Sequence, residues 1–342
     1  MPQVLNIQQF LTDSKGKGII DVRSPGEFAQ GHIPGAVSVP LFNNEERAII
    51  GTIYKQRSRQ EAVLKGLEIV GPKLNNLVLQ AKEHARDNIL YIHCWRGGMR
   101  SGFVSMLMEM YGIKTFTLKG GYKSYRTLAL ESFKQPRLIH LLGGKTGSGK
   151  TRILNHLATL NQSVIDLEGL AHHKGSAFGA LGEPEQPTQE QFENELFIRL
   201  FFIPDTEILW LEDESRMIGK KVIPEGLWEQ MRNTKIFYIN LPFEERLDYI
   251  TKEYGIFSAA DLEQSILRIT KRLGPEQTKN AIAALKENDP RTAFWYCLHY
   301  YDKTYQYGLS TREKSQVTEL DFDKMDIEKI SKELVKNIRV NG

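Results

Sequence analysis

The segment around Cys94 combines the residue types that favour a reactive thiolate. This segment, HCWRGGMRS at residues 93–101, follows a short apolar run and precedes an amphipathic stretch, which predicts a loop between a strand and a helix. Backbone N–H groups at a helix start favour an anion, and neighbouring arginines stabilise a thiolate. We therefore predict that Cys94 is the catalytic nucleophile. The residues expected to bind an anion beside it are Arg96, Gly97, Gly98 and Arg100.

A second pattern predicts a site for a di- or triphosphate. Residues 144–151, GKTGSGKT, match the pattern G-x4-G-K-[ST] and lie between a predicted strand and a predicted helix. In such a loop the backbone N–H groups cradle phosphate oxygens, the lysine adds positive charge, and the last hydroxyl is placed to bind Mg²⁺. The pattern leaves open whether the ligand is ATP or an isoprenyl diphosphate. The residues expected to bind it are Gly144, Gly147, Gly149, Lys150 and Thr151.

Carboxylates at the ends of two later strands are candidates for the metal or its water ligands. The stretch SVIDLEG contains Asp166 and Glu168, and the stretch ILWLEDE contains Glu212, Asp213 and Glu214. Because Mg²⁺ prefers oxygen ligands such as carboxylates, we expect Mg²⁺ at this position. The metal-binding set that we favour is Thr151, Asp166, Glu212 and Asp213.

The elements that must position these residues alternate between strands and helices. In the first part of the chain, apolar runs at 19–22 and 89–92 and the stretch KTFTLKGG at 114–121 are separated by amphipathic stretches. Buried strands that alternate with helices predict a parallel α/β sheet. The pattern restarts after a polar stretch near residue 135. We therefore predict two domains, at 1–135 and 136–342.

The second domain is predicted to be an α/β domain of the P-loop NTPase type, with a helical appendage from about residue 243. Its strands are expected at 138–142, 163–167, 207–211 and 235–241. Its helices are expected at 152–160, 189–202, 244–254, 259–273, 275–288 and 291–305.

Aromatic and basic side chains indicate where further ligands could bind. In the last expected helix, one stripe typical of a core consists of Phe294, Leu298, Tyr301 and Tyr305. The aromatic residues off this stripe, which could stack on bases or line an apolar groove, are Trp295, Tyr296 and Tyr300. Basic groups that could contact an RNA backbone, although such groups are more commonly only solvated, are Lys55, Arg57, Arg59, Lys220 and Lys221.

Composition narrows the class of protein. With 342 residues, a formal net charge of +3 and 25% charged residues, the sequence is typical of a globular protein. No apolar run reaches the roughly 20 residues that span a bilayer, so we expect no membrane partner. No secretory signal is visible, and Cys94 and Cys297 do not form a disulfide framework. We expect a cytoplasmic protein with free thiols, in which Cys297 is structural.

Two stretches near the start of the chain, together with the Cys94 loop, carry a resemblance. DVRSPGEF at residues 21–28 and GHIPGA at residues 31–36 resemble the signature of the rhodanese family, and the likeness covers most of residues 1–130. The resemblance implies a rhodanese-like fold and a persulfide or perselenide on Cys94. The loop departs from the family because it reads Cys-x5-Arg instead of Cys-x4-Arg, which is the length found in rhodanese-fold tyrosine phosphatases. A longer loop favours a tetrahedral, phosphate-like anion over thiosulfate.

Three further stretches narrow the resemblance. They are GTIYKQ at 51–56, DLEGLA at 166–171 followed by Gly175-Ser176, and EDESR at 212–216. With the Cys94 loop they resemble the family of bacterial tRNA 2-selenouridine synthases along essentially the whole chain. The resemblance implies a transferase that acts on wobble 2-thiouridine in the tRNAs for Lys, Glu and Gln. It also implies selenophosphate as selenium donor and a first step in which geranyl diphosphate alkylates the sulfur.

Two other functions stay open at this point. One is an ATP-dependent sulfurtransferase that thiolates RNA, in which the P-loop activates the base. The other is a small-molecule kinase that a rhodanese module regulates. The first predicts nucleotide hydrolysis coupled to sulfur transfer, and the second predicts kinase turnover that survives the loss of Cys94.

Overall fold

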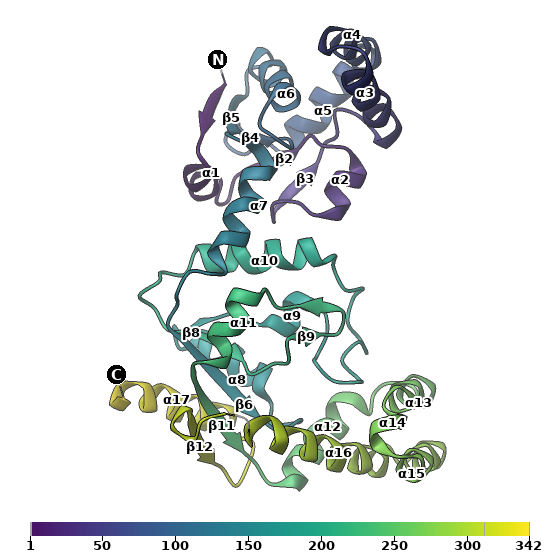
Figure 1. Cartoon of the computed structure of the whole chain (residues 1–342), viewed down its shortest axis with the longest axis vertical. Helices are drawn as coiled ribbons and strands as arrows, with labels where there is room; N and C mark the ends of the chain where they lie inside the picture. The colour runs from purple at the N-terminus through teal and green to yellow at the C-terminus, as the bar shows by residue number, and fades with distance from the viewer. Residues whose placement is uncertain (1, 311, 342) are drawn as a thin grey trace. The chain divides into compact units, whose positions relative to one another are not determined.

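The structure, a computed structural model, describes residues 2–310 and 312–341, with side chains described at 2–303 and 312–337. The chain divides into two compact units, Met1–Ser132 with Glu193–Ile198, and Phe133–Phe192 with Arg199–Gly342 (Figure 1). Each unit contains one five-stranded sheet. The predicted class of two parallel α/β folds is confirmed, whereas the boundary expected between residues 135 and 136 stays a prediction.

The sheet of the first unit is parallel throughout and has the strand order β1-β5-β4-β2-β3. Its strands are β1 (Gln3–Leu5), β2 (Gly18–Asp21), β3 (Ala36–Ser38), β4 (Ile89–His93) and β5 (Lys114–Leu118). Its helices are α1 (Ile7–Asp13), α2 (Pro25–Gln30), α3 (Asn44–Gln56), α4 (Arg59–Val70), α5 (Leu74–Glu83), α6 (Met99–Met110) and α7 (Gly121–Ser132). Central strand β4 is apolar and buried almost throughout, as expected for a strand covered on both faces.

Register within this sheet brings two functional segments together. Strands β2 and β4 are neighbours, and Asp21 lies opposite His93. Because parallel strands end at the same edge of a sheet, the loops after β2 and β4 start side by side. The loop after β2 is tied down by a capping box, in which the Ser24 side chain accepts from the Glu27 N–H and the Glu27 side chain accepts from the Ser24 N–H.

The sheet of the second unit is also parallel and has the strand order β12-β11-β6-β8-β7. Its strands are β6 (Ile139–Gly144), β7 (Ser163–Val164), β8 (Leu209–Glu212), β11 (Lys235–Asn240) and β12 (Val317–Asp321). Strands β9 (Met217–Ile218) and β10 (Lys221–Val222) form a separate antiparallel pair. The helices that accompany the sheet are α8 (Lys150–Thr159), α9 (Leu167–Ala171), α11 (Glu225–Arg232) and α17 (Ile327–Asn341). Helix α10 (Gln189–Phe201) is divided, since its segment Glu193–Ile198 belongs to the first unit.

Two features of this unit differ from the sequence-based expectation. The strand expected at 163–167 ends at Val164, because Asp166 instead caps α9 by accepting a hydrogen bond from the Gly169 N–H. The C-terminal part is not helical throughout, since β12 pairs with β11 from Ile236↔Val317 onward. A five-residue edge strand carries too little apolar periodicity to be recognised before its partner strand is known.

The helical appendage follows β11. It consists of α12 (Phe243–Tyr254), α13 (Ala259–Arg268), α14 (Thr270–Leu273), α15 (Pro275–Lys286) and α16 (Pro290–Ser310). Phe294 and Leu298 are buried in its core, as their stripe predicted, and Cys297 is buried beside them. The side chain of Tyr305 lies outside the described residues. Within the described part of the chain, no helix is long and apolar enough to cross a membrane.

Candidate functional site

Cys94 lies in the loop between β4 and α6. The strand ends at His93 and the helix begins at Met99, so the expected strand-loop-helix arrangement is present. The Cys94 side chain is only 3% exposed, and its Sγ lies 3.2 Å from Oγ of Ser101 in the first turn of α6. The Ser101 hydroxyl donates to the carbonyl oxygen of Gly98 at 3.2 Å. The thiol is thus placed at a helix N-terminus, where the helix dipole favours an anion.

The turn after β5 packs directly against this loop. Gly121 has a φ of +60°, and a Cβ on it would lie 2.3 Å from the carbonyl oxygen of Cys94. Gly97 has a φ of +62°, and a Cβ on it would lie 2.2 Å from the carbonyl oxygen of Leu118. The Tyr122 N–H donates to the Cys94 carbonyl at 2.8 Å. Glycine at both positions therefore lets the two loop backbones meet.

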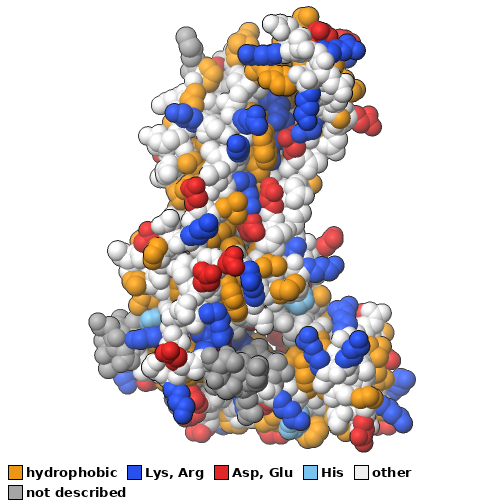
Figure 2. All heavy atoms as spheres, viewed as in Figure 1, with side chains coloured by type: hydrophobic (Ala, Val, Ile, Leu, Met, Phe, Trp, Pro, Cys, Tyr) orange, Lys and Arg blue, Asp and Glu red, His pale blue; other side chains and the backbone are white. Residues whose placement is uncertain are grey.

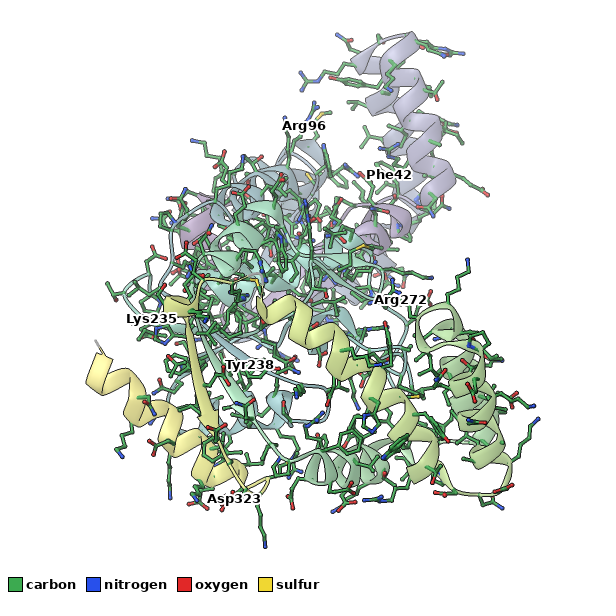
Figure 3. The ribbon with its side chains drawn as sticks, turned by 60° about the horizontal axis from the view of Figure 1, so that its bottom comes forward. Phe42, Arg96, Lys235, Tyr238, Arg272 and Asp323 are labelled. Atoms are coloured by element: carbon green, nitrogen blue, oxygen red, sulfur yellow. The ribbon has the colours of Figure 1, made fainter. Side chains whose placement is uncertain are left out.

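The two predicted anion-binding arginines lie in different environments. Arg100 donates to Glu27 through Nη1 at 2.9 Å and through Nη2 at 3.4 Å. Burial opposes the ionisation of Glu27, but the hydrogen bond and charge of Arg100 outweigh it and lower the pKa of Glu27. Arg96, which is labelled in Figure 3, is exposed. The charge of Arg100 is therefore balanced within the protein, and Arg96 is the more accessible of the two to a ligand.

A buried polar cluster supports the strand ends next to Cys94. Arg23 donates through Nε to Asp21 Oδ2 at 2.8 Å and through Nη2 to the Gly31 carbonyl at 2.7 Å. Its guanidinium carbon lies 3.8 Å from the centre of the Tyr122 ring. His93 Nε2 lies 3.8 Å from Asp21 Oδ2, yet burial lowers the pKa of His93. This part of the rhodanese-like signature therefore has a structural role, and it holds a neutral imidazole.

The P-loop joins β6 to α8. Gly144, Gly147 and Gly149 have φ values of +150°, +83° and +70°, which favour glycine. A Cβ on Gly147 would lie 2.8 Å from Cδ1 of Ile250, so the loop also passes close to helix α12. Lys150 begins α8 and donates from Nζ to the Gly144 carbonyl at 3.3 Å. The loop therefore has the backbone conformation that a phosphate cradle requires.

Three buried glutamates lie close together, and two of them contact Thr151 at the start of α8. The Thr151 hydroxyl lies 2.8 Å from Glu212 Oε1 and 3.3 Å from Glu168 Oε2. Glu168, Glu212 and Glu214 each offer an oxygen within 4.8 Å of the others, and their exposures are 8%, 0% and 9%. Burial raises the pKa of all three. Repulsion among the carboxylates adds to this for Glu168 and Glu214, and the charge of Lys150 opposes it.

This cluster fits a hard divalent cation. Glu212 Oε2 is buried and has no hydrogen-bond partner among the described residues, which is costly for a carboxylate oxygen unless a cation binds there. The donor set consists only of carboxylate and hydroxyl oxygens, which are the ligands of Mg²⁺. Two members of the favoured set have other partners, because Asp166 caps α9 and Asp213 pairs with Arg312 at 2.5 Å. Among the expected carboxylates, the structure brings Glu168 and Glu214 to Glu212 instead.

A pocket of about 620 Å³ opens beside the P-loop. Figure 3 labels two of its lining residues, Tyr238 on the sheet and Arg272 on the helical appendage. The other aromatic residues that line it are Trp228, Tyr249, Tyr254, Tyr300 and Tyr301. The other basic residues that line it, besides Lys150, are Arg152, Lys174, Arg216 and Arg232. The pocket therefore places an aromatic wall next to the predicted phosphate-binding loop and the carboxylate cluster.

The aromatic side chains of α16 do not all lie where helical periodicity predicted them. Tyr300 lines the pocket, as it was expected to line a groove. Tyr301 was expected in the core but also lines the pocket, where its hydroxyl accepts from the Ala177 N–H at 3.0 Å. Trp295 packs on His299, with 4.1 Å between ring centres, and Tyr296 packs against the appendage core. Tyr301 lies at the pocket because its hydroxyl binds Ala177 in the loop after α9. Periodicity within one helix cannot predict a contact with a distant loop.

Two known protein families match the chain, one in its first part and one in its second. A family described as the tRNA 2-selenouridine synthase AAA domain matches residues 137–333. A family described as the rhodanese-like domain matches residues 6–128. The rhodanese resemblance of the first part is thus confirmed.

Individual relatives carry the same description. The tRNA 2-selenouridine synthase of Nitrosomonas europaea is 38% identical over 247 residues, which cover 69% of this chain and 63% of that relative. The tRNA 2-selenouridine synthase of Proteus mirabilis is 35% identical over 342 residues, covering 90% of this chain and 92% of that relative. The protein of the same description from Cronobacter sakazakii is 34% identical, covering 92% of both chains.

Proposed function

The chain belongs to the tRNA 2-selenouridine synthase family, and on that basis we propose that it converts wobble 2-thiouridine in tRNA to 2-selenouridine. The observation that carries the proposal is the pairing of two anion sites in one chain, a buried cysteine at a helix start and a P-loop beside three glutamates. A transferase that handles both a selenium donor and a diphosphate needs both kinds of site. An ATP-dependent sulfurtransferase would also use both sites, but it would require nucleotide hydrolysis coupled to sulfur transfer.

Selenium transfer is assigned to the Cys94 loop. Selenophosphate carries a tetrahedral anion, and a helix start with two loop glycines and exposed Arg96 suits such an anion. Cys94 supplies the nucleophile, and Ser101 holds its Sγ at 3.2 Å. The thiolate attacks C2 of the geranylated uridine and expels the geranylthiol. The selenium of selenophosphate then displaces Cys94 from C2, and water takes up the phosphoryl group as phosphate when the P–Se bond breaks. Arg100 acts through Glu27 to fix the loop rather than as the principal ligand for the anion.

Alkylation of the RNA sulfur is assigned to the P-loop pocket. The diphosphate of geranyl diphosphate would bind the P-loop N–H groups and Lys150, and the aromatic wall would cover the apolar tail. The thiouridine sulfur then attacks the first carbon of the tail, an S–C bond forms, and the C–O bond to diphosphate breaks. Mg²⁺ held by Thr151, Glu168, Glu212 and Glu214 would neutralise charge on the departing diphosphate.

The order of the two reactions follows from leaving-group chemistry. A sulfur that carries an alkyl group leaves the uridine ring as a neutral thiol after protonation, which is easier than expelling sulfide. Alkylation first therefore prepares the ring for selenium. We place these reactions in the cytoplasm, on the tRNAs for Lys, Glu and Gln.

The decisive experiment omits each substrate in turn. Purified protein is incubated with tRNA that contains wobble 2-thiouridine, geranyl diphosphate and selenophosphate, and nucleosides are identified by mass spectrometry. We expect geranylated nucleoside without selenophosphate, selenouridine with both, and loss of selenouridine alone in Cys94→Ala. Unchanged thiouridine under every condition would reject the proposal. ATP-dependent exchange of sulfur would support the sulfurtransferase instead.

A further inference from the structure

Helices α3 and α4 form a hairpin that the two reactions above do not use. The hairpin packs mainly on itself, and α3 has no buried residue (Figure 1). Helix α4 buries only Ala62, Gly66 and Val70, spaced four residues apart. The stretch GTIYKQ at 51–56, on which part of the family resemblance rests, lies at the end of α3. Core packing therefore does not account for this stretch.

The tip of the hairpin lies next to the Cys94 loop. Arg59, the first residue of α4, has Nη2 3.7 Å from Sδ of Met99, the first residue of α6. Helix α6 follows the loop that contains Cys94, Trp95 and Arg96. Because Cys94 itself is buried, a nucleotide that reaches it must pass the side chains around the loop entrance.

The basic side chains of the hairpin are paired with acidic ones toward its base but less so at its tip. Toward its base, Lys65 pairs with Glu68 at 2.7 Å and Lys73 pairs with Glu46. At the tip, Arg57 has a longer contact of 3.5 Å to Glu61. Lys55, Arg59 and the loop's Arg96 have no acidic partner within 4.0 Å among the side chains that the structure describes. On the face shown in Figure 2, Lys and Arg side chains lie among hydrophobic ones at this end of the first unit.

Aromatic side chains accompany these cations. Tyr54 on α3 is 55% exposed and Trp95 in the Cys94 loop is 37% exposed. Sequence-tolerant binding of single-stranded nucleic acid combines Lys and Arg on phosphates with aromatic faces under the bases. Both components are present in the same unit, on the hairpin tip and in the Cys94 loop that Arg59 approaches at Met99.

We propose that the hairpin tip, formed by Tyr54, Lys55, Arg57 and Arg59, binds the single-stranded RNA loop that carries the reacting uridine. This inference rests on the proposed function for the identity of the RNA. Lys55 and Arg59 contact phosphates, and Tyr54 stacks on a base. Together they hold the loop while its modified uridine enters the Cys94 site, where Trp95 and Arg96 are the first side chains that it meets.

The test measures binding of the full-length protein to a fluorescent anticodon stem-loop RNA at several salt concentrations, without selenophosphate or geranyl diphosphate. For Lys55→Ala/Arg59→Ala, we expect weaker binding and a salt slope smaller by about 1.4, because each single-strand phosphate contact contributes about 0.7. Tyr54→Ala should weaken binding about tenfold without changing the slope, and Tyr54→Phe should bind normally. Lys65→Ala, whose ammonium already pairs with Glu68, is the matched control.

Three other results would contradict the proposal, and each has a different consequence. Equal affinity and equal slope in the tip variants and Lys65→Ala would overturn it while leaving the proposed function intact. Loss of binding only in Leu64→Ala/Leu67→Ala, whose side chains are exposed on the same hairpin, would move the interface to an apolar surface. Failure of the wild-type protein to bind RNA at all would reject the proposed function together with this inference.

Discussion

The Cys94 loop and the P-loop share the same strand-loop-helix arrangement, but the acidic side chains beside them differ in how far their charge is balanced. Both follow a strand of a parallel sheet and lead into a helix start. The Cys94 loop turns on one glycine with positive φ, Gly97, and the P-loop turns on three, Gly144, Gly147 and Gly149. Beside Cys94, the acidic side chains are already neutralised, since Asp21 pairs with Arg23 and Glu27 pairs with Arg100. Beside the P-loop, three glutamates are gathered without enough positive charge. In both loops the helix N-terminus favours an anion. The charge balance of the neighbouring acidic side chains differs, and only beside the P-loop does it favour a cation as well.

The largest effects should separate the two sites. Cys94→Ser should reduce selenation about 10³-fold or more, because a hydroxyl is a far weaker nucleophile than a thiolate, and should leave geranylation within about twofold. Lys150→Ala should do the reverse, reducing geranylation about 10²-fold or more by removing a charge on the diphosphate. Single-turnover assays on thiouridine tRNA and on pre-geranylated tRNA measure each step. If Lys150→Ala abolished selenation of pre-geranylated tRNA but spared geranylation, the assignment would be wrong.

The carboxylate cluster should respond to metal in a way that the Cys94 site does not. Glu212→Gln should lower geranylation about 10²-fold and raise the Mg²⁺ concentration needed for half-maximal rate, because the buried oxygen that it replaces is a proposed ligand. Selenation of pre-geranylated tRNA should be unaffected by EDTA. Asp213→Asn is the matched variant, since Asp213 pairs with Arg312 and should leave the Mg²⁺ dependence unchanged.

Backbone packing around Cys94 can be tested with two glycines. Gly121→Ala should destabilise the protein by at least about 2 kcal/mol, because its Cβ would lie 2.3 Å from the Cys94 carbonyl oxygen at a φ of +60°. Gly98→Ala should change stability by no more than about 0.5 kcal/mol, since its φ is −109° and no heavy atom lies within 4 Å of an added Cβ. Thermal unfolding measures both. Equal shifts in melting temperature would contradict the proposed contact.

The smallest effect concerns pH. Burial and the charge of Glu212 raise the pKa of Glu214 to about 8, so between its unfolded pKa near 4.5 and this value the folded state binds more protons. Without metal, stability should therefore fall as pH rises from about 5 to 8. Glu27 contributes with the opposite sign, because its lowered pKa gives stability above about 4.5 that is lost in acid.

Calorimetry in EDTA should show a melting temperature about 3 °C lower at pH 8 than at pH 6. Glu214→Gln should reduce this difference, and Mg²⁺ should reverse it, whereas Glu27→Gln should alter only the acid side. A melting temperature that rises over the same range in EDTA would contradict the stated pKa of Glu214.

Local patterns were sufficient to predict the fold class and the position of both anion loops. The glycine spacing of residues 144–151 and the strand-loop-helix setting of Cys94 depend on neighbours within about ten residues, and both are present in the structure. Helix α10, expected at 189–202, runs from Gln189 to Phe201. By contrast, β12 could not be predicted, because an edge strand becomes recognisable only through its partner β11.

Which acidic residues cluster near Thr151, and which pair with other groups, could be seen only in the tertiary structure. The sequence by itself determined which apolar runs are followed by carboxylates, since that depends only on where the apolar runs stop. It did not determine which carboxylates converge. Asp166 and Asp213 are bound by a helix N-terminus and an arginine, and Glu168, Glu212 and Glu214 meet around Thr151. Only Glu212 lies in a strand, because Glu168 is in α9, which Asp166 caps, and Glu214 follows the end of β8. The cap on α9 and the path of the chain after β8 therefore decide which carboxylates meet.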